Sequence, residues 1–403
     1  MERSFIPLPT EKQLAFLDWE VGVFFHFGIR TFYEGHTDWD GKEMPAAGFS
    51  PTALDCRQWI AAAKAGGAKY TVLTAKHHDG FALWPSKYTD YGVKRSPWKN
   101  GQGDVIKEYT DACRALDMKT GLYYSPAQAG FERTPKTDYD DFFINQITEL
   151  LTNYGKIDYL WFDGCGSEGH SYDTLRIVSA IRSLQPDILL FNLWDPDTRW
   201  VGNEDGMAPF DASCVVRADA TDLNGGVRFL PYECDCKLHP GSWFYADAEK
   251  ENVRTADEVV GLYELSVGRG GNLLINIAPD RTGKIPASDA AIFAAAGEKI
   301  ATAFARPLTI RTEATASGVN VYSDFEQSCS CAVLSEDLRR GERIRSYAVF
   351  YRCGETEILL TAGKTVGHKR IVRFPCVALG GENRLFVTFS ANQPAALRIS
   401  LFG

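Results

Sequence analysis

Short apolar runs alternate with amphipathic stretches over the first three quarters of the chain. The runs cover residues 22–27, 69–74, 120–124, 159–163, 188–192, 199–203, 243–245 and 272–277. Residues 53–65, 104–118, 141–154, 172–184 and 257–267 carry apolar side chains at helical spacing, and several of these stretches open with Asp, Thr or Ser. Such alternation is typical of βα units around a parallel sheet. Eight runs predict a (β/α)8 TIM-like barrel.

The pattern changes after a last amphipathic stretch at residues 290–304, for which Ser288 or Asp289 is the expected cap. Apolar residues then recur with period two in residues 319–322, 347–352, 357–361, 384–390 and 397–402. Runs of this kind between Gly-containing turns predict a C-terminal antiparallel β-sandwich. We therefore expect two domains, a barrel over residues 1–305 and a sandwich over residues 306–403.

Composition and charge exclude several classes of protein. The chain is 45% apolar and 24% charged, as in an ordinary globular protein. Its net charge of -9 and the lack of any Lys/Arg run argue against a nucleic-acid partner. No segment reaches the ~20 apolar residues of a membrane helix, and residues 1–20 contain no apolar stretch of signal-peptide length. We expect a cytoplasmic location for the chain as given, unless an export signal was removed, and the oligomeric state is open.

The carboxyl ends of the predicted barrel strands are unusually polar. Reacting groups of (β/α)-barrels project from these ends. The residues there are His26, His77, His78, Asp79, Tyr124, Asp163, Asn192, Asn203, Glu204, Trp243 and Asn276. A single one of them could be a hydrogen-bonded core residue, but so many together indicate a site for a polar ligand.

Two of these residues are carboxylates that end apolar strands. Asp163 ends the run Tyr-Leu-Trp-Phe-Asp and is followed by Gly164, and Glu204 ends Arg-Trp-Val-Gly-Asn-Glu. A helix cap or a salt-bridged strand end is the alternative interpretation of Asp163. Glycoside hydrolysis requires two carboxylates at one cavity, because one attacks or activates water while the other protonates the leaving oxygen. The pair therefore predicts a glycosidase site.

The histidines allow two interpretations. Neutral sugars are held by hydrogen bonds and by contact with ring faces, whereas imidazoles also ligate metals. His26, His77 and His78 have no acidic or thiol ligand at a familiar spacing, and the C-x-C pair beginning at Cys234, near His239, lacks the spacing of structural zinc. We therefore expect sugar binding, with no metal and no cofactor.

At these residues the sequence resembles the α-L-fucosidases of glycoside hydrolase family 29. The matching segments are residues 24–28, 70–81, 83–91, 161–164 and 268–286. The long second segment, which ends in Lys-His-His-Asp-Gly-Phe, is highly specific. In that family the Asp of the Trp-Phe-Asp-Gly segment is the nucleophile. The resemblance therefore implies a retaining exo-α-L-fucosidase in which Asp163 forms a covalent fucosyl-enzyme with a fucosylated oligosaccharide or glycoconjugate.

The general acid/base has two candidates under the same resemblance. Trp-Val-Gly-Asn-Glu, ending at Glu204, looks like the motif that carries it in the branch cleaving α-1,3/1,4-linked fucose. Glu233 lies in Pro-Tyr-Glu-Cys-Asp, which looks like another family segment near the sugar, and we favour Glu204. The substrate-binding residues that the resemblance implies are His26, Trp39, His77, His78, Tyr124, Trp161, Glu233 and Trp243.

The chain departs from that branch in loops that would face the leaving group. Residues 125–130 read Ser-Pro-Ala-Gln-Ala-Gly where a Trp-Asp-Arg-His run is usual, and Asp38 stands where Glu is more common. The leaving-group preference is therefore open. Two alternatives also stay open: a barrel glycosidase with another sugar specificity, and a catalytically inactive sugar-binding homologue. The retained carboxylate pair argues against the second, because holding buried carboxylates costs free energy.

Overall fold

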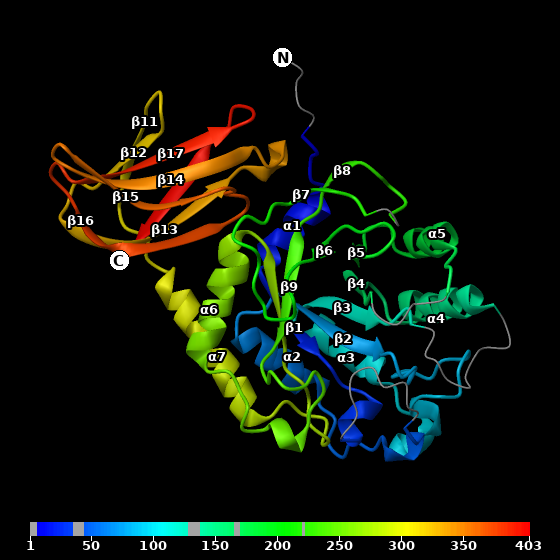
Figure 1. Cartoon of the computed structure of the whole chain (residues 1–403). Coiled ribbons are helices and arrows are strands. Elements are labelled where there is room, and N and C mark those ends of the chain that lie inside the picture. The colour runs from blue at the N-terminus through cyan, green and yellow to red at the C-terminus, as the bar shows by residue number, and fades with distance from the viewer. Residues whose placement is uncertain (1–5, 35–43, 128–137, 165–169, 220–221) are drawn as a thin grey trace.

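The computed structural model describes residues 6–34, 44–127, 138–164, 170–219 and 222–403. Its centre is a parallel sheet of eight strands in the order β5-β4-β3-β2-β1-β10-β9-β6, curled into a barrel (Figure 1). A single parallel bridge between Phe191 and Thr198 joins the two edges, so the barrel is almost closed. The (β/α)8 prediction is confirmed.

In the described part of the chain, six helices surround this sheet. The strands are β1 (Val21–Phe25), β2 (Tyr70–Lys76), β3 (Lys119–Tyr124), β4 (Tyr159–Phe162), β5 (Leu189–Phe191), β6 (Arg199–Trp200), β9 (Tyr232–Lys237) and β10 (Asn272–Asn276). The helices are α2 (Cys56–Ala65), α3 (Val105–Ala115), α4 (Tyr139–Asn153), α5 (Thr174–Leu184), α6 (Ala256–Ser266) and α7 (Ala287–Ala303). Side chains of Asp or Thr cap α2 to α6, as expected. α7 instead begins behind Pro286, so neither Ser288 nor Asp289 is its cap.

Two predicted strands differ from the structure. Residues 243–245 lie in a loop, and the barrel strand in this region is β9. Its sequence Tyr-Glu-Cys-Asp-Cys-Lys alternates charged residues with cysteines, whereas buried parallel strands usually read as continuous apolar runs. β6 is shorter than predicted, because Gly202 and Glu204 take φ values of 109° and 65° and turn the chain out of the sheet. A hairpin of β7 (Val215–Arg217) and β8 (Val227–Phe229) lies between β6 and β9.

Helix α1 (Glu11–Trp19) closes the amino end of the barrel. A capping box between Thr10 and Gln13 begins this helix. Phe16 inserts its ring among the first residues of the strands, with centroids 6.0 Å from Tyr70 and 5.4 Å from Tyr159. This end is therefore filled by packed rings, which leaves the carboxyl end for a site.

Two antiparallel sheets follow the barrel. One contains β11 (Arg311–Ala314), β12 (Val319–Tyr322), β17 (Arg384–Ala391), β14 (Ile344–Cys353) and β15 (Thr356–Gly363), and the other β16 (Arg370–Leu379), β13 (Gln327–Glu336) and β18 (Leu397–Phe402). Both sheets contribute to one buried core, which includes Val321, Leu334 and Val349. The predicted sandwich is confirmed, although β11, β13 and β16 were not among the predicted runs. It stands on the side of the barrel formed by α6 and α7 (Figure 1). Within the described ranges, no helix is long and apolar enough to span a bilayer.

Candidate active site

A cavity of about 490 Å³ opens at the carboxyl end of the barrel strands. Its lining residues are Phe24, His26, His77, His78, Tyr123, Trp161, Asp163, Gly164, Phe191, Asn192, Trp200, Glu204, Asp235 and Trp243. The structure thus brings together both predicted carboxylates, the three histidines and two of the three tryptophans. Trp39 and Asp38 lie outside the described residues, as do residues 128–130 of the segment after β3 that departs from the family pattern.

Asp163 directly follows β4 and is held by two neighbours. Tyr123 donates its hydroxyl hydrogen to Asp163 Oδ2 at 3.0 Å, and His78 Nε2 lies 3.4 Å from the same oxygen. His78 is oriented in turn by a 2.6 Å bond between its Nδ1 and Ser125 Oγ. The Asp163 side chain is still 26% exposed, so a ligand in the cavity can reach it. An oriented, accessible carboxylate can attack a substrate or activate a water molecule.

His26 and His77 are neutral in this environment. Burial lowers the pKa of His26 to about 3 and the pKa of His77 well below its usual value. Asn276 Nδ2 donates to the Trp243 carbonyl at 2.7 Å, so Asn276 Oδ1 accepts the hydrogen of His26 Nδ1 at 2.8 Å. Nε2 of His26 is then a hydrogen-bond acceptor. Nδ1 of His77 is buried and has no partner among the described residues. Both rings can therefore bond ligand hydroxyls without carrying charge.

The loop after β6 holds Glu204 in an uncommon conformation. Its φ of 65° is rare for a residue with a Cβ, and such strain persists only where the surroundings impose it. Two backbone bonds tie the loop to β9, from Val201 N to the Glu233 carbonyl and from Gly206 N to the Asp235 carbonyl, each 3.0 Å long. The backbone frame thus determines where the Glu204 side chain lies.

The Glu204 carboxylate is held at the rim of the cavity. Its Oε2 accepts a hydrogen bond from Trp243 Nε1 at 3.2 Å and lies 3.3 Å from Lys237 Nζ. The side chain is 48% exposed, and the Trp243 ring packs 4.8 Å from the His26 ring. Glu204 can therefore exchange protons with solvent and with a ligand beside Trp243.

Asp235 is a third carboxyl of the cavity that the sequence analysis did not single out. It is buried on β9, and Trp200 Nε1 donates to its Oδ1 at 2.7 Å. Burial, together with the charges of Glu204 and Asp163, raises the pKa of Asp235 to about 7 against the effect of this bond. The pattern Glu-x-Asp-x-Lys in β9 could have indicated Asp235 from the sequence, because it places three ionisable side chains on one face of a strand.

Tyr124 does not line the cavity, contrary to expectation. Its hydroxyl donates to Gln146 Oε1 on α4 at 2.6 Å, outside the barrel sheet. Tyr123 points inward instead, since successive side chains of a strand face opposite sides. The strand register pairs Tyr123 with Trp161 and Trp161 with Phe191, and all three rings line the cavity. Both faces of β3 are buried, so polarity could not tell the two tyrosines apart.

Glu233 does not line the cavity either. It is fully buried in the barrel and accepts hydrogen bonds from Tyr70 at 2.5 Å, Trp161 Nε1 at 2.9 Å and Tyr159 at 3.4 Å. Burial raises the pKa of Glu233 to about 8, so the carboxyl is largely protonated at neutral pH. Its position supports the Trp161 ring, which lines the cavity, and offers no contact to a ligand there.

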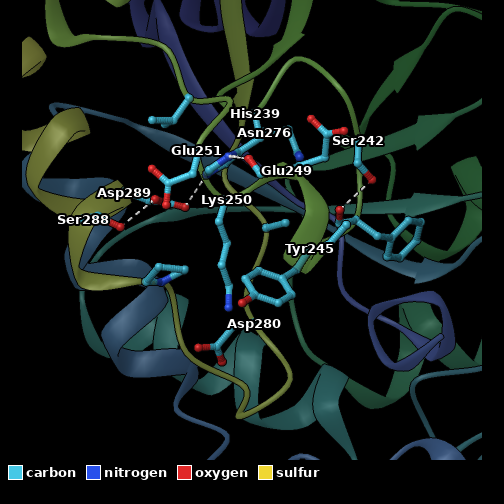
Figure 2. Close-up of a pocket in the computed structure, with 15 residues that line it drawn as sticks. His239, Ser242, Tyr245, Glu249, Lys250, Glu251, Asn276, Asp280, Ser288 and Asp289 are labelled. Carbon is cyan, nitrogen blue, oxygen red and sulfur yellow. Dashed lines mark hydrogen bonds and ion pairs between the residues drawn. The ribbon is translucent and has the colours of Figure 1, made fainter. Parts of the chain in front are cut away.

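A second cavity, of about 390 Å³, lies between the loop after β9 and the start of α7 (Figure 2). Its half-buried His239 is bonded within the protein: His239 Nε2 lies 2.9 Å from Oδ2 of the buried Asp289, and His239 Nδ1 lies 2.9 Å from the Glu249 carbonyl. Both ring nitrogens of His239 are thus engaged within the protein. Among the described residues, no three His, Cys, Asp or Glu side chains gather so as to hold a metal.

The fold and the first cavity define the class of protein. Strand-end carboxylates, uncharged imidazoles and indole rings around one cavity at the carboxyl end of a (β/α)8 barrel suit the cleavage of a glycosidic bond in a neutral sugar. A barrel glycoside hydrolase combines these features.

Comparison with known proteins identifies the family. The family model described as alpha-L-fucosidase matches residues 42–301. Alpha-L-fucosidase 1 of Arabidopsis thaliana is 32% identical over 454 residues, which cover 98% of this chain and 88% of that protein. The chain therefore belongs to the α-L-fucosidase family, as its motifs predicted, and is a glycoside hydrolase with α-L-fucosidase activity.

Solved structures of this family share the whole architecture. A glycoside hydrolase 29 family member from an unknown rumen bacterium is 31% identical, with a TM-score of 0.87 over 98% of this chain and 77% of its own. A GH29 fucosidase from Ruminococcus gnavus, in complex with fucose, is 25% identical, with a TM-score of 0.84 over 98% of this chain and 95% of its own. Both barrel and sandwich are therefore features of the family fold.

Proposed function

We propose that this protein is a retaining exo-α-L-fucosidase, which removes terminal α-L-fucosyl residues from oligosaccharides or glycoconjugates by double displacement. The observation that carries the proposal is that Asp163 and Glu204 line one cavity. The fucose complex of the Ruminococcus gnavus fucosidase supports a fucosyl ring as the occupant. His26, His77 and Trp243 supply the uncharged polar groups and the aromatic face that a neutral sugar needs.

In the first step, an Asp163 oxygen attacks the anomeric carbon of the bound fucosyl residue. The bond to the leaving oxygen breaks while Glu204 transfers its proton to that oxygen. Tyr123 and His78 orient the attacking carboxylate through Oδ2. The product of this step is a fucosyl ester of Asp163 and a free hydroxyl on the leaving group.

In the second step, Glu204 takes a proton from water as the water oxygen attacks the same carbon. The ester bond to Asp163 breaks, and the carboxylate is restored. Two inversions return the α configuration of the substrate. The exposed position of Glu204 suits this exchange of roles, because solvent reaches it once the leaving group has departed.

We also propose α-1,3/1,4-linked fucose as the substrate linkage. The support is the Trp-Val-Gly-Asn-Glu motif, which ends at Glu204 and resembles the branch of the family with that preference. A panel of α-1,2-, α-1,3-, α-1,4- and α-1,6-fucosyl oligosaccharides tests it. Faster cleavage of the α-1,2 or α-1,6 substrates would contradict this part of the proposal and leave the mechanism intact.

Product stereochemistry tests the mechanism. Early-time NMR during hydrolysis of 4-nitrophenyl α-L-fucoside should detect α-L-fucose first. First-formed β-L-fucose would mean that Asp163 activates water, with the carboxyls ~6.5 to 9.5 Å apart instead of ~5 to 5.5 Å.

As a second measurement, Asp163→Gly should fold normally and lose activity by about a thousandfold or more. Azide should partly restore it and form β-L-fucosyl azide, and a mutant with parent-like turnover would remove Asp163 from the nucleophile role.

A further inference from the structure

Strand β9 carries three ionisable residues at alternate positions, at three different depths of the barrel. Glu233 is buried beneath the cavity and bonded to Trp161. Lys237 reaches the rim and pairs with Glu204. Asp235 lies between them and lines the cavity. Neither Asp235 nor its bond to Trp200 takes part in the two displacement steps, although this buried carboxyl lines the same cavity as Asp163 and Glu204.

Asp235 fixes an aromatic ring at the edge of the cavity. Only 4% of Asp235 is exposed, whereas Trp200, whose Nε1 donates to Asp235 Oδ1 at 2.7 Å, is 39% exposed. An indole with one anchored edge and an accessible surface is a suitable platform for a sugar ring. Because the hydrogen bond restrains the ring before a ligand arrives, less side-chain entropy is lost on binding. Trp200 lines the cavity together with Glu204, the proposed proton donor to the leaving group, and we therefore assign the platform to the leaving group.

The same residue also anchors the backbone of the Glu204 loop. The Asp235 carbonyl accepts the hydrogen of Gly206 N, two residues after Glu204, while its carboxyl holds Trp200, four residues before. Both ends of the segment 200–206 are thereby tied to one position of β9. The positive φ of Glu204 lies between these two anchors, where a restraint is needed to keep it.

We propose that Asp235 is a positioning residue for the reaction, which aligns the leaving group on Trp200 with the carboxyl of Glu204. This inference rests on the proposed function, because it takes Glu204 to be the acid/base. Two consequences follow. Loss of the Trp200 anchor should lower kcat/KM for substrates with a sugar leaving group, and loss of the Asp235 carboxyl should change the pH dependence of kcat/KM.

The second consequence depends on the charges around Asp235. Glu204 on the loop after β6 and Asp163 after β4 act on it as negative charges, Lys237 follows it on β9, and its register partner on β10 is the uncharged Leu274. Burial raises the pKa of Asp235 to about 7. Above this pH Asp235 adds a negative charge to the cavity beside the proposed acid/base, so the activity should persist to higher pH than it would without Asp235.

Three variants test the proposal. Asp235→Asn keeps an oxygen that can accept the Trp200 hydrogen bond but cannot ionise, and should move the alkaline limb of kcat/KM down by about one pH unit. Trp200→Phe keeps a ring without the donor and should lower kcat/KM for fucosyl oligosaccharides about tenfold. It should leave α-L-fucosyl fluoride, whose leaving group has no ring, near the parent rate. Asp205→Asn removes an exposed carboxylate from the same loop and is the matched control, with parent-like kinetics expected.

A double variant shows whether Trp200 and Asp235 act together. If they do, Asp235→Ala with Trp200→Phe should lose no more than the larger single loss, because both remove one interaction. Additive losses, or a parent-like pH profile and kinetics in both Asp235 variants, would overturn the proposal. If circular dichroism shows that Asp235→Ala does not fold, Asp235→Asn and Trp200→Phe still test the proposal. Failure of the proposed function is recognised separately, since Glu204→Ala would then show no dependence on the leaving group.

Discussion

The two candidate catalytic carboxylates differ in what holds them. Asp163 is oriented by the Tyr123 hydroxyl and the His78 ring, whereas Glu204 lies beside the ammonium of Lys237 and the indole of Trp243. Asp163 is also the less exposed of the two. A shielded, oriented carboxylate suits bond formation to carbon, and an exposed one suits proton exchange.

Replacement of Glu204 by Ala should therefore have an effect that depends on the leaving group. We expect cleavage of fucosyl oligosaccharides to fall by about 10² to 10⁴-fold, because a sugar alkoxide needs the proton. An aryl fucoside with an acidic phenol leaves largely unaided and should be cleaved much closer to the parent rate. Steady-state kinetics on the two substrate types measure the difference.

Glu233→Gln is the control for this comparison. Glu233 is buried and bonded to Tyr70 and Trp161, so its replacement should change all substrates alike. If instead the Glu233 variant alone discriminates between leaving groups, then Glu204 is a binding residue and the two assignments must be exchanged.

At the level of elements, β3 shows that neighbouring residues of one strand serve different parts of the molecule. Tyr123 faces the cavity and donates to Asp163, while Tyr124 faces α4 and donates to Gln146. Both tyrosines are fully buried and each donates a hydroxyl hydrogen bond to a side chain, so they form a matched pair. Replacing each of them by Phe removes one hydroxyl and distinguishes an effect on catalysis from an effect on stability.

Tyr123→Phe should lower kcat about tenfold, because Asp163 loses an orienting bond to a charged group. Tyr124→Phe should leave kcat unchanged and lower the free energy of unfolding by about 1 to 3 kcal/mol, because Gln146 is left unpaired. Kinetics and thermal melts of both variants measure these effects. A larger loss of kcat in Tyr124→Phe than in Tyr123→Phe would mean that Tyr124, and not Tyr123, faces the cavity.

On the scale of the whole molecule, the sandwich is bonded to the barrel through buried polar contacts. Glu342, which precedes β14 and is 1% exposed, accepts hydrogen bonds from Cys214 N at 2.9 Å and from Ser213 Oγ at 2.5 Å. Ser213 and Cys214 lead into β7, in the long connection between β6 and β9. The sandwich therefore supports the segment that joins the two strands bearing Trp200 and Asp235.

Glu342→Ala should destabilise the protein without changing its chemistry. The buried Cys214 N–H would lose its partner, which costs about 1 to 3 kcal/mol and lowers Tm by a few degrees. Activity per folded molecule should remain that of the parent, and Glu382→Ala, at an exposed sandwich position, should change neither quantity. An unchanged Tm for Glu342→Ala would show that this contact does not contribute to stability.

The sequence by itself determined the order of the elements and the chemistry at the strand ends. Apolar periodicity is a local property, so most of the barrel strands and helices follow from it, and the motifs around His77 and Asp163 are contiguous. Asp163 and Glu204 were found in this way because each ends an apolar run. The same rule missed β9, whose inward residues are of ionisable types and whose outward residues are Cys234 and Cys236.

Only the tertiary structure decided which side of each strand faces the cavity and which carboxyl is accessible. Where both faces of a strand are buried, periodicity reports burial but not direction, and Tyr123 and Tyr124 cannot be distinguished. The state of Glu233 depends on Tyr70, 163 positions away in the chain, and that of Asp235 depends on Trp200 and on burial in a closed barrel. Hydrogen bonds and desolvation join residues that are distant in sequence, so no local pattern contains them.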